Sequence, residues 1–111
     1  PEGRAVIQTI TIRDDYFREY RLRSDFIRHY VFPGGMLPSM ARFREEAEKA
    51  GLRCRDIFEF GQDYARTLRE WLQRFEAKLP EIRAMGYDEA FIRNWRFYLS
   101  MCAAAFASGR T

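Results

Sequence analysis

The sequence predicts part of an α/β domain in which two strands are separated and followed by helices. The first observation is a run of β-branched residues at positions 4–12, and the second is a strand candidate at residues 52–60. The third is the helical spacing of apolar residues in much of the remaining chain. A chain of 111 residues has room for one domain. Two strands are too few for a self-sufficient sheet, so we expect a piece of a larger domain.

The two predicted strands differ in their expected surroundings. In residues 4–12 only Gln8 interrupts an apolar first half, and Ile10 and Ile12 alternate with threonines. This pattern favours a strand buried on both faces, as in a parallel sheet. Residues 52–60 are predicted to have one solvent-exposed face, because they include the charged side chains of Arg53, Arg55 and Glu59.

Two short helices are predicted after the first strand. The Asp14-Asp15 pair opens a helix over residues 16–22, and Ser24 fits the cap of a second helix over residues 25–30. Acidic residues dilute the positive charge of this region, so it is either a solvated surface or a contact for anionic lipid headgroups. The arginines concerned are Arg13, Arg18, Arg21, Arg23 and Arg28.

A loop is predicted over residues 32–38, because two prolines and a glycine pair cannot lie inside a helix or a central strand. This loop is either a rigid turn between helices or the wall of a pocket, since Gly34 and Gly35 let the backbone approach a ligand closely. The next helix is predicted over residues 39–50, and Gly51 supplies its left-handed end.

The second half of the chain is predicted to be helical. A long helix begins at Asp63, Pro80 kinks it or starts a new segment that ends at Gly86, and Asp88 caps a last helix that ends at Gly109. One face of the long helix carries Tyr64, Leu68, Trp71, Leu72, Phe75 and Leu79. The same spacing recurs in Phe91, Trp95, Tyr98, Leu99, Cys102 and Phe106.

Composition excludes several classes of protein. The net charge is +3, from 19 basic and 16 acidic residues with interleaved signs, so we expect no nucleic-acid partner. The two cysteines, Cys54 and Cys102, have no CxxC spacing and the chain contains one His, so we expect no metal. We expect a cytoplasmic location, because the sequence shows no disulfide pattern, no signal-peptide pattern at residues 1–4 and no long apolar run.

Three side chains are candidates for chemistry, each with a structural alternative. Gln8 either satisfies hydrogen bonds within the strand or points at a ligand beyond the strand's end. Tyr98 lies on an apolar helix face, where it is either a core residue or a hydroxyl that meets a ligand. His29 is a general base by type, although no nucleophile lies near it in sequence and a half-exposed structural role is the alternative.

Four stretches, in order along the chain, resemble the cyclopropane-fatty-acyl-phospholipid synthase family, the mycolic acid cyclopropane synthase-like methyltransferases. They are residues 24–39 with the FPGG and LPS motifs, residues 61–71, residues 86–95, and residues 98–106 with a YL-x-x-C motif. The resemblance implies a Rossmann-like methyltransferase sheet with a mostly helical lipid-pocket insertion. Residues 1–111 would then be the C-terminal portion of one catalytic domain, without its cofactor-binding half.

The resemblance also implies an activity. Members of this family use S-adenosylmethionine to add a methylene across the cis double bond of an unsaturated acyl chain, or to add a methyl branch, and a bound bicarbonate removes a proton. The implied partners are membrane phospholipid acyl chains at the inner membrane surface. We expect the isolated chain to be inactive, with a possible homo-oligomer or strand-swapped dimer. The alternative is a stand-alone helical lipid-binding or interaction module without catalysis.

Individual residue roles follow from the same resemblance. Tyr98 matches the tyrosine whose hydroxyl reaches bicarbonate, and Ile10 matches a residue whose backbone contacts that ion. Gln8 stands where cyclopropane-forming members carry a His, and a glutamine donates a hydrogen bond but has no titratable charge. This departure favours methylation without ring closure, or a different acceptor. No cofactor-binding residue is assigned, and the implied substrate-binding residues are Phe32, Gly34, Gly35 and Leu37.

Overall fold

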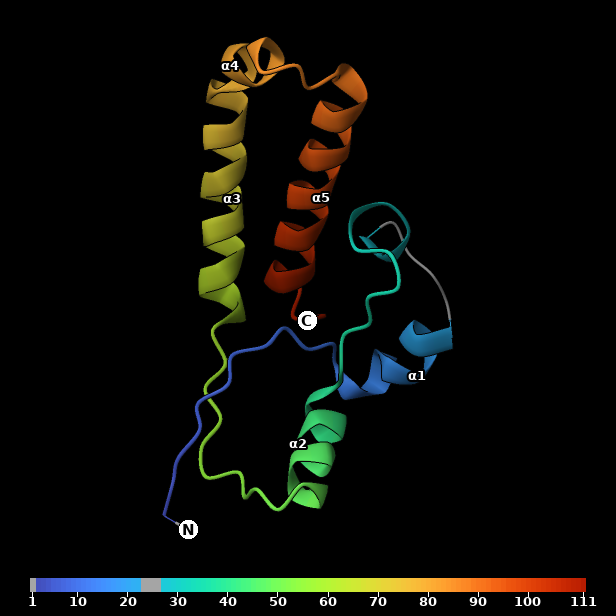
Figure 1. The fold of residues 1–111 in the computed structure, drawn as a ribbon, viewed down its shortest axis with the longest axis vertical. Helices are drawn as coiled ribbons and strands as arrows, with labels where there is room; N and C mark the ends of the chain where they lie inside the picture. The colour runs from blue at the N-terminus through green and yellow to red at the C-terminus, as the bar shows by residue number, and fades with distance from the viewer. Residues whose placement is uncertain (1, 23–26) are drawn as a thin grey trace.

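The computed structural model describes residues 2–22 and 27–111, and helices dominate them. The elements are α1 (Asp14–Leu22), the π-helix η1 (Ile27–Val31), α2 (Met40–Lys49), α3 (Gly61–Ala77), α4 (Leu79–Ala84) and α5 (Glu89–Ala107). Figure 1 shows α3 and α5 side by side as a hairpin closed by α4, with α1 and α2 toward the opposite end. The radius of gyration is 17.0 Å, against about 13 Å for a compact domain of this length, so the chain is extended.

The predicted starts of α2 and α5 are confirmed by capping contacts, whereas α3 begins at Gly61, two residues before the predicted start at Asp63. The Ser39 hydroxyl accepts a hydrogen bond from the Arg42 amide at 3.1 Å, which starts α2. The Asp88 carboxylate accepts from the Phe91 amide at 2.9 Å, which starts α5. Pro80 lies in the first turn of α4, where backbone N–H groups have no partner within the helix, so its lack of an N–H removes no helical hydrogen bond.

The region predicted as a second short helix is only partly described. The predicted cap Ser24 and the predicted first residue Asp25 lie outside the described residues. From Ile27 to Val31 the chain forms a π-helix, and the Phe32 amide continues it by donating to the Ile27 carbonyl oxygen at 2.7 Å. The loop predicted after it is confirmed over residues 32–38, which hold no helix.

The two predicted strands are not formed, and this part of the fold prediction is wrong for this structure. Among the described residues the only β-type pairing is a parallel bridge between Ile12 and Ser39, with the Ile12 amide donating to the Pro38 carbonyl oxygen at 2.9 Å. Residues 4–11 and 52–60 have strand-like composition, but a strand requires a neighbour to complete its hydrogen bonds. No second segment in the described ranges forms that ladder with either of them.

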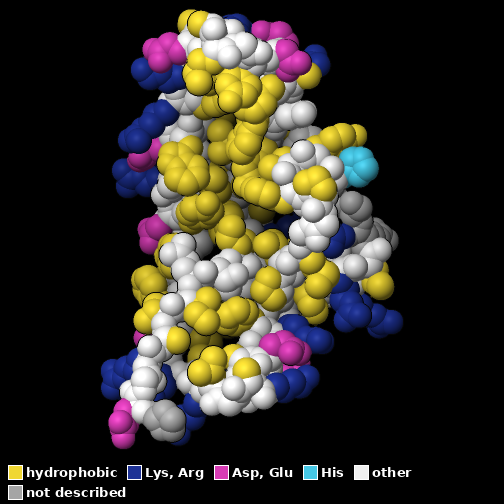
Figure 2. All heavy atoms as spheres, in the orientation of Figure 1, with side chains coloured by type: hydrophobic (Ala, Val, Ile, Leu, Met, Phe, Trp, Pro, Cys, Tyr) yellow, Lys and Arg dark blue, Asp and Glu magenta, His cyan; other side chains and the backbone are white. Residues whose placement is uncertain are grey.

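The core lies between α3 and α5, as the apolar spacing of both helices predicts. Leu68 and Leu99 are buried there together with Phe106, and the small residues Ala65 and Ala103 let the helices approach closely. Half-buried side chains surround this core, namely Tyr64, Leu72, Phe75, Tyr98 and Cys102. Figure 2 shows hydrophobic side chains gathered over this hairpin and charged ones along the outer side of α3.

Polar contacts hold the hairpin at both ends. Near α4, the Arg96 guanidinium on α5 pairs with both carboxylate oxygens of Glu76 on α3. At the other end, the Gln62 amide donates to the Phe106 and Ala107 carbonyl oxygens at 3.2 and 3.1 Å, which satisfies the end of α5.

Apolar side chains outside the hairpin remain exposed. Val6 is 99% exposed, and further exposed side chains in the two predicted strand segments are Ile7, Ile10, Leu52, Ile57, Phe58 and Phe60. None of the described helices combines the length and the apolar character that crossing a bilayer requires. The two segments predicted as strands thus contain seven of the fifteen large hydrophobic side chains that are exposed among the described residues.

Candidate functional site

Tyr98 sits where the α3–α5 core meets the loop at residues 32–38. Its ring makes edge-to-face contacts with Trp95, at 5.1 Å between centroids, and with Phe32, at 6.2 Å. Burial raises the pKa of the Tyr98 phenol to about 12, and the neighbouring Cys102 and Tyr64 add to this effect. Tyr98 is therefore a neutral hydroxyl near physiological pH, suited to donating a hydrogen bond and unsuited to removing a proton.

The loop that brings Phe32 to Tyr98 begins with a tight turn. The Gly35 amide donates to the Phe32 carbonyl oxygen at 3.0 Å, and Gly34 has φ of +79°. Pro33 and Gly34 occupy the positions that a type II turn reserves for proline and glycine. A Cβ on Gly35 would lie 3.1 Å from the Phe32 carbonyl oxygen. The turn thus requires a glycine at position 34, and a side chain at position 35 would crowd its backbone, which supports the rigid-turn alternative.

The far end of this loop is attached to α1. The Leu37 amide donates to the Tyr20 hydroxyl at 2.9 Å, and the Arg28 guanidinium of η1 lies 4.5 Å from the centroid of the Tyr20 ring. Sequence analysis did not identify Tyr20. The available signal was its position four residues after Tyr16 on one helix face.

A row of aromatic rings extends from Tyr98 along α5, and we call it the aromatic row. Trp95 is followed by Phe91 at 6.0 Å between centroids, and Phe91 stacks on Tyr87 at 4.4 Å. Phe32 continues the row beyond Tyr98. The helical spacing predicted Phe91, Trp95 and Tyr98 on one face but not the rings at the two ends. The row thus connects the exposed turn before α5 with the loop at residues 32–38.

Gln8 and Ile10, the other predicted site residues, are exposed on the N-terminal segment. The Ile10 carbonyl oxygen accepts from the Thr9 hydroxyl at 3.4 Å. Within the described part of the chain, no hydrogen bond joins Gln8 or Ile10 to Tyr98. These three residues therefore do not assemble an anion site in this structure, and they do not fit a bicarbonate as they stand.

The N-terminal segment is held at its far end by the C-terminal residues. The Arg13 amide donates to the Arg110 carbonyl oxygen at 3.1 Å, and the Thr111 hydroxyl donates to the Thr11 carbonyl oxygen. A surface pocket of about 420 Å³ opens at this junction, lined by Thr11, Ile12, Arg13, Asp14, Asp15, Met40, Glu59, Gly109 and Thr111. The junction places the segment near the end of α5 and not beside the aromatic row.

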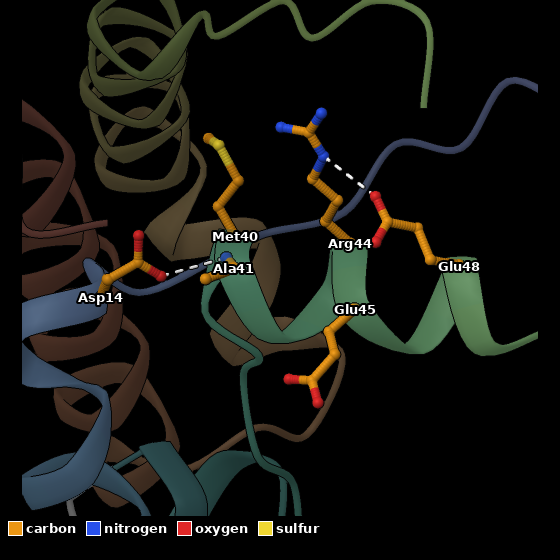
Figure 3. Close-up of a pocket in the computed structure, with 6 residues that line it drawn as sticks. All are labelled: Asp14, Met40, Ala41, Arg44, Glu45 and Glu48. Carbon is orange, nitrogen blue, oxygen red and sulfur yellow. Dashed lines mark hydrogen bonds and ion pairs between the residues drawn. The ribbon is translucent and has the colours of Figure 1, made fainter. Parts of the chain in front are cut away.

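A second surface pocket, of about 360 Å³, lies along α2. Figure 3 shows that its charged groups are already engaged: the Asp14 carboxylate accepts from the Ala41 amide at 3.0 Å, and Arg44 pairs with Glu48 at 3.5 Å. Glu45 points to the opposite side of α2 and pairs with Lys49 at 3.1 Å. This pocket contains none of the predicted site residues and has the character of a solvated charged surface.

His29 is exposed and lies edge-on to the adjacent Tyr30 ring, with 4.6 Å between centroids. None of the ring contacts or hydrogen bonds described above connects it with Tyr98 or the aromatic row. Its surroundings agree with the structural alternative.

Comparisons with known proteins identify the family. The sequence model described as Mycolic acid cyclopropane synthetase matches residues 1–111. The chain is 36% identical over 110 residues to the tuberculostearic acid methyltransferase of Mycobacterium tuberculosis, covering 98% of this chain and 26% of that protein. It is 42% identical over 81 residues to the cyclopropane-fatty-acyl-phospholipid synthase of Escherichia coli, covering 73% and 21%.

A further relative is cyclopropane mycolic acid synthase 3 of Mycobacterium tuberculosis, 37% identical over 86 residues that cover 78% of this chain and 30% of that protein. The chain belongs to the mycolic acid cyclopropane synthetase family, which confirms the resemblance found in its motifs. It spans about a quarter of the length of these curated relatives.

Proposed function

We propose that this chain is part of an S-adenosylmethionine-dependent methyltransferase that modifies unsaturated acyl chains of lipids, by cyclopropanation or by methyl branching. The observation that carries the proposal is the family match over residues 1–111. It is supported by relatives whose names specify fatty-acyl-phospholipid and mycolic acid cyclopropane synthases.

Within such an enzyme, residues 1–111 would be the C-terminal portion of one catalytic domain and would supply the lipid-facing part. The aromatic row supports this role, because a continuous apolar surface suits an acyl chain, and few polar groups interrupt it. Tyr98, as a neutral hydroxyl within that row, would present a hydrogen-bond donor to the reacting region. Phe32 and Leu37 would contribute to the same surface from the loop, with Gly34 and Gly35 shaping its turn.

The exposed segments 4–12 and 52–60 would be strands of a Rossmann-like sheet completed by the rest of the protein. Their β-branched and aromatic composition supports this, as does the exposure of Val6 and Phe58. The S-adenosylmethionine site would lie mostly in that remaining part, so the isolated chain would not transfer a methyl group. Its lipid substrates would place the whole enzyme in the cytoplasm, at the inner surface of a membrane.

The role of bicarbonate stays a prediction from the resemblance. If pairing of residues 4–12 brought Gln8 toward Tyr98, the Gln8 amide would donate a hydrogen bond without adding charge. This property favours methyl branching over ring closure as the outcome.

The test is lipid analysis of Escherichia coli cells that lack their own cyclopropane synthase and express the whole protein containing these residues. Cells are fed methionine with a fully deuterated methyl group, and the fatty acids are analysed by mass spectrometry. Ring closure removes a deuteron from the transferred methyl group and leaves two deuterium atoms. A methyl branch that keeps three deuterium atoms instead requires loss of a proton from the acyl chain, which restores a double bond. Labelled fatty acids in either form are expected.

Two further outcomes bear on the proposal. Unlabelled lipids from cells that contain the folded protein would overturn it, and lipid binding without labelling would favour a stand-alone helical lipid-binding module. Labelled lipid formed by the purified 111-residue chain alone would contradict the proposed place of the cofactor site.

A further inference from the structure

One side chain on α1 contacts both sides of the loop at residues 32–38. The Tyr20 hydroxyl accepts a hydrogen bond from the Leu37 amide at 2.9 Å, near the end of the loop. The face of the Tyr20 ring receives the Arg28 guanidinium at 4.5 Å, and Arg28 lies in η1, just before the loop. Tyr20 thus bridges two points of the chain between which the loop runs.

The same loop determines where the Phe32 ring lies. Its tight turn is closed by the bond from the Gly35 amide to the Phe32 carbonyl oxygen at 3.0 Å. A rigid turn fixes the loop's internal shape but not its orientation toward α5. That orientation depends on what holds the loop ends, and the contact of Phe32 with Tyr98 depends on it in turn.

Tyr20 lies on α1, and a hydrogen bond connects α1 with α2. At the start of α1 the Asp14 carboxylate accepts from the Ala41 amide at 3.0 Å, which connects α1 with the first turn of α2. The Leu37 bond joins residues 17 apart in sequence, so it is a tertiary contact and not part of a local turn. The connection therefore runs from α2 through α1 and Tyr20 to the loop.

We propose that Tyr20 is a positioning residue that holds the loop at residues 32–38 closed against α5 and so keeps Phe32 in contact with Tyr98 for acyl-chain binding. The proposal rests on the proposed lipid methyltransferase function. Tyr20 acts through Leu37 and Arg28, because its own hydroxyl is already occupied by the Leu37 amide. It would determine how well the acyl-chain surface is assembled, without taking part in the reaction.

The first test is hydrogen exchange in the whole protein, comparing Tyr20→Phe with the matched control Tyr16→Phe. Tyr16 lies one turn earlier on α1, and its ring also receives guanidinium groups, from Arg13 at 5.3 Å and Arg110 at 5.2 Å. No hydrogen bond of the Tyr16 hydroxyl is found among the residues described. Both variants keep the ring, but only Tyr20→Phe removes an acceptor from the Leu37 amide.

Peptides that contain Leu37 are expected to exchange about fivefold faster in Tyr20→Phe, the usual effect of losing one neutral hydrogen bond. Tyr16→Phe is expected to leave their exchange unchanged. Equal exchange of the Leu37 peptides in the wild-type protein and Tyr20→Phe would overturn the proposal, whether or not the protein methylates lipids. This readout therefore separates the proposal from the proposed function.

The second test is steady-state kinetics with phospholipid vesicles that contain unsaturated acyl chains. A positioning residue alters the fraction of protein that is ready to bind, so KM for the lipid should rise by up to about fivefold in Tyr20→Phe while kcat changes less than twofold. Faster loop exchange with unchanged KM would overturn the positioning role. A wild-type protein without activity on lipid would instead refute the proposed function. The hydrogen-exchange result alone would then show whether Tyr20 holds the loop.

Discussion

Replacing Tyr98 with phenylalanine isolates a hydroxyl that the sequence and the structure both place at the candidate site. The substitution removes the hydroxyl and retains the ring that contacts Trp95 and Phe32. We expect two separate consequences, one for the pH dependence of stability and one for turnover. Each has its own measurement.

The stability effect follows from the raised pKa of Tyr98, which is about 12 in the folded chain against an ordinary value of 10.0 for a tyrosine phenol. Above the lower value the unfolded chain releases this proton while the folded chain retains it. Stability is therefore fully present below about pH 10 and falls as the pH rises toward about 12. For a fully buried phenol, this rise in pKa would correspond to roughly 2.7 kcal/mol of stability. Because Tyr98 is only half-buried, solvent screening reduces the expected loss to about 1 kcal/mol.

Urea unfolding measured at about pH 8 and about pH 11 checks this expectation. The wild-type chain should lose more of its unfolding free energy between the two pH values than Tyr98→Phe does. Tyr87→Phe, at the exposed end of the aromatic row, controls for removal of a phenol. Identical pH dependence in the wild-type chain and Tyr98→Phe would refute the argument that burial holds this proton.

The second consequence concerns turnover in the whole protein. A hydroxyl that orients the group accepting the proton contributes roughly 10²-fold to the rate, the usual scale of such assistance. Tyr98→Phe should therefore lower kcat by about that factor at neutral pH, where the variant remains folded. Turnover within twofold of wild type, with unchanged stability at about pH 8, would show that Tyr98 serves only the core.

Three further outcomes are expected. Gln62→Ala should lower the unfolding free energy by about 0.5–1.5 kcal/mol, because it removes the side-chain donor from the last carbonyls of α5. Gln73→Ala, at an exposed position of α3, should change it by less than about 0.5 kcal/mol, and equal effects would contradict the capping role. Leu68→Ala should lower the unfolding free energy by about 2–5 kcal/mol, because it leaves a cavity in the core. Leu22→Ala, at an exposed site, should leave the unfolding free energy nearly unchanged, and similar urea midpoints for both variants would place the core elsewhere. The purified chain should self-associate through the exposed edge of its segment at residues 4–12, which light scattering would detect. A monodisperse monomer with exchange-protected amides there would refute this.

The helices could be predicted because their signals lie close together in the sequence. Asp88 is three residues from the amide that it caps, and Ser39 has the same relation to Arg42. The apolar faces of α3 and α5 repeat every three or four residues, so each helix carries its own pattern. The pattern also predicts burial where it does not occur. The spacing of Trp71 fits the buried face, but its side chain is 46% exposed. Periodicity indicates a face, and packing determines how wide the buried part is.

The strands could not be predicted in the same way, because a strand is defined by its neighbour. The composition of residues 4–12 indicates strand propensity, and that propensity is real. Its hydrogen-bond partners are a separate, nonlocal requirement, which the described residues meet only at Ile12 and Ser39. The same distinction explains why residues 52–60 remain irregular despite a similar composition.

This distinction also separates the predicted site residues. Tyr98 takes its position from α5, which α3 and the Gln62 contacts hold within this chain, so a prediction from helical spacing was sufficient for it. Gln8 belongs to a segment whose position depends on pairing, and its local sequence specifies only the alternation of its side chains. Tyr20 differs from both: helical spacing could place it on a face of α1, but no sequence pattern indicates that its hydroxyl meets a backbone amide 17 residues away. Tertiary polar contacts of this kind are therefore where a structure adds most to the sequence, and the Leu37 amide is the atom at which this one can be measured.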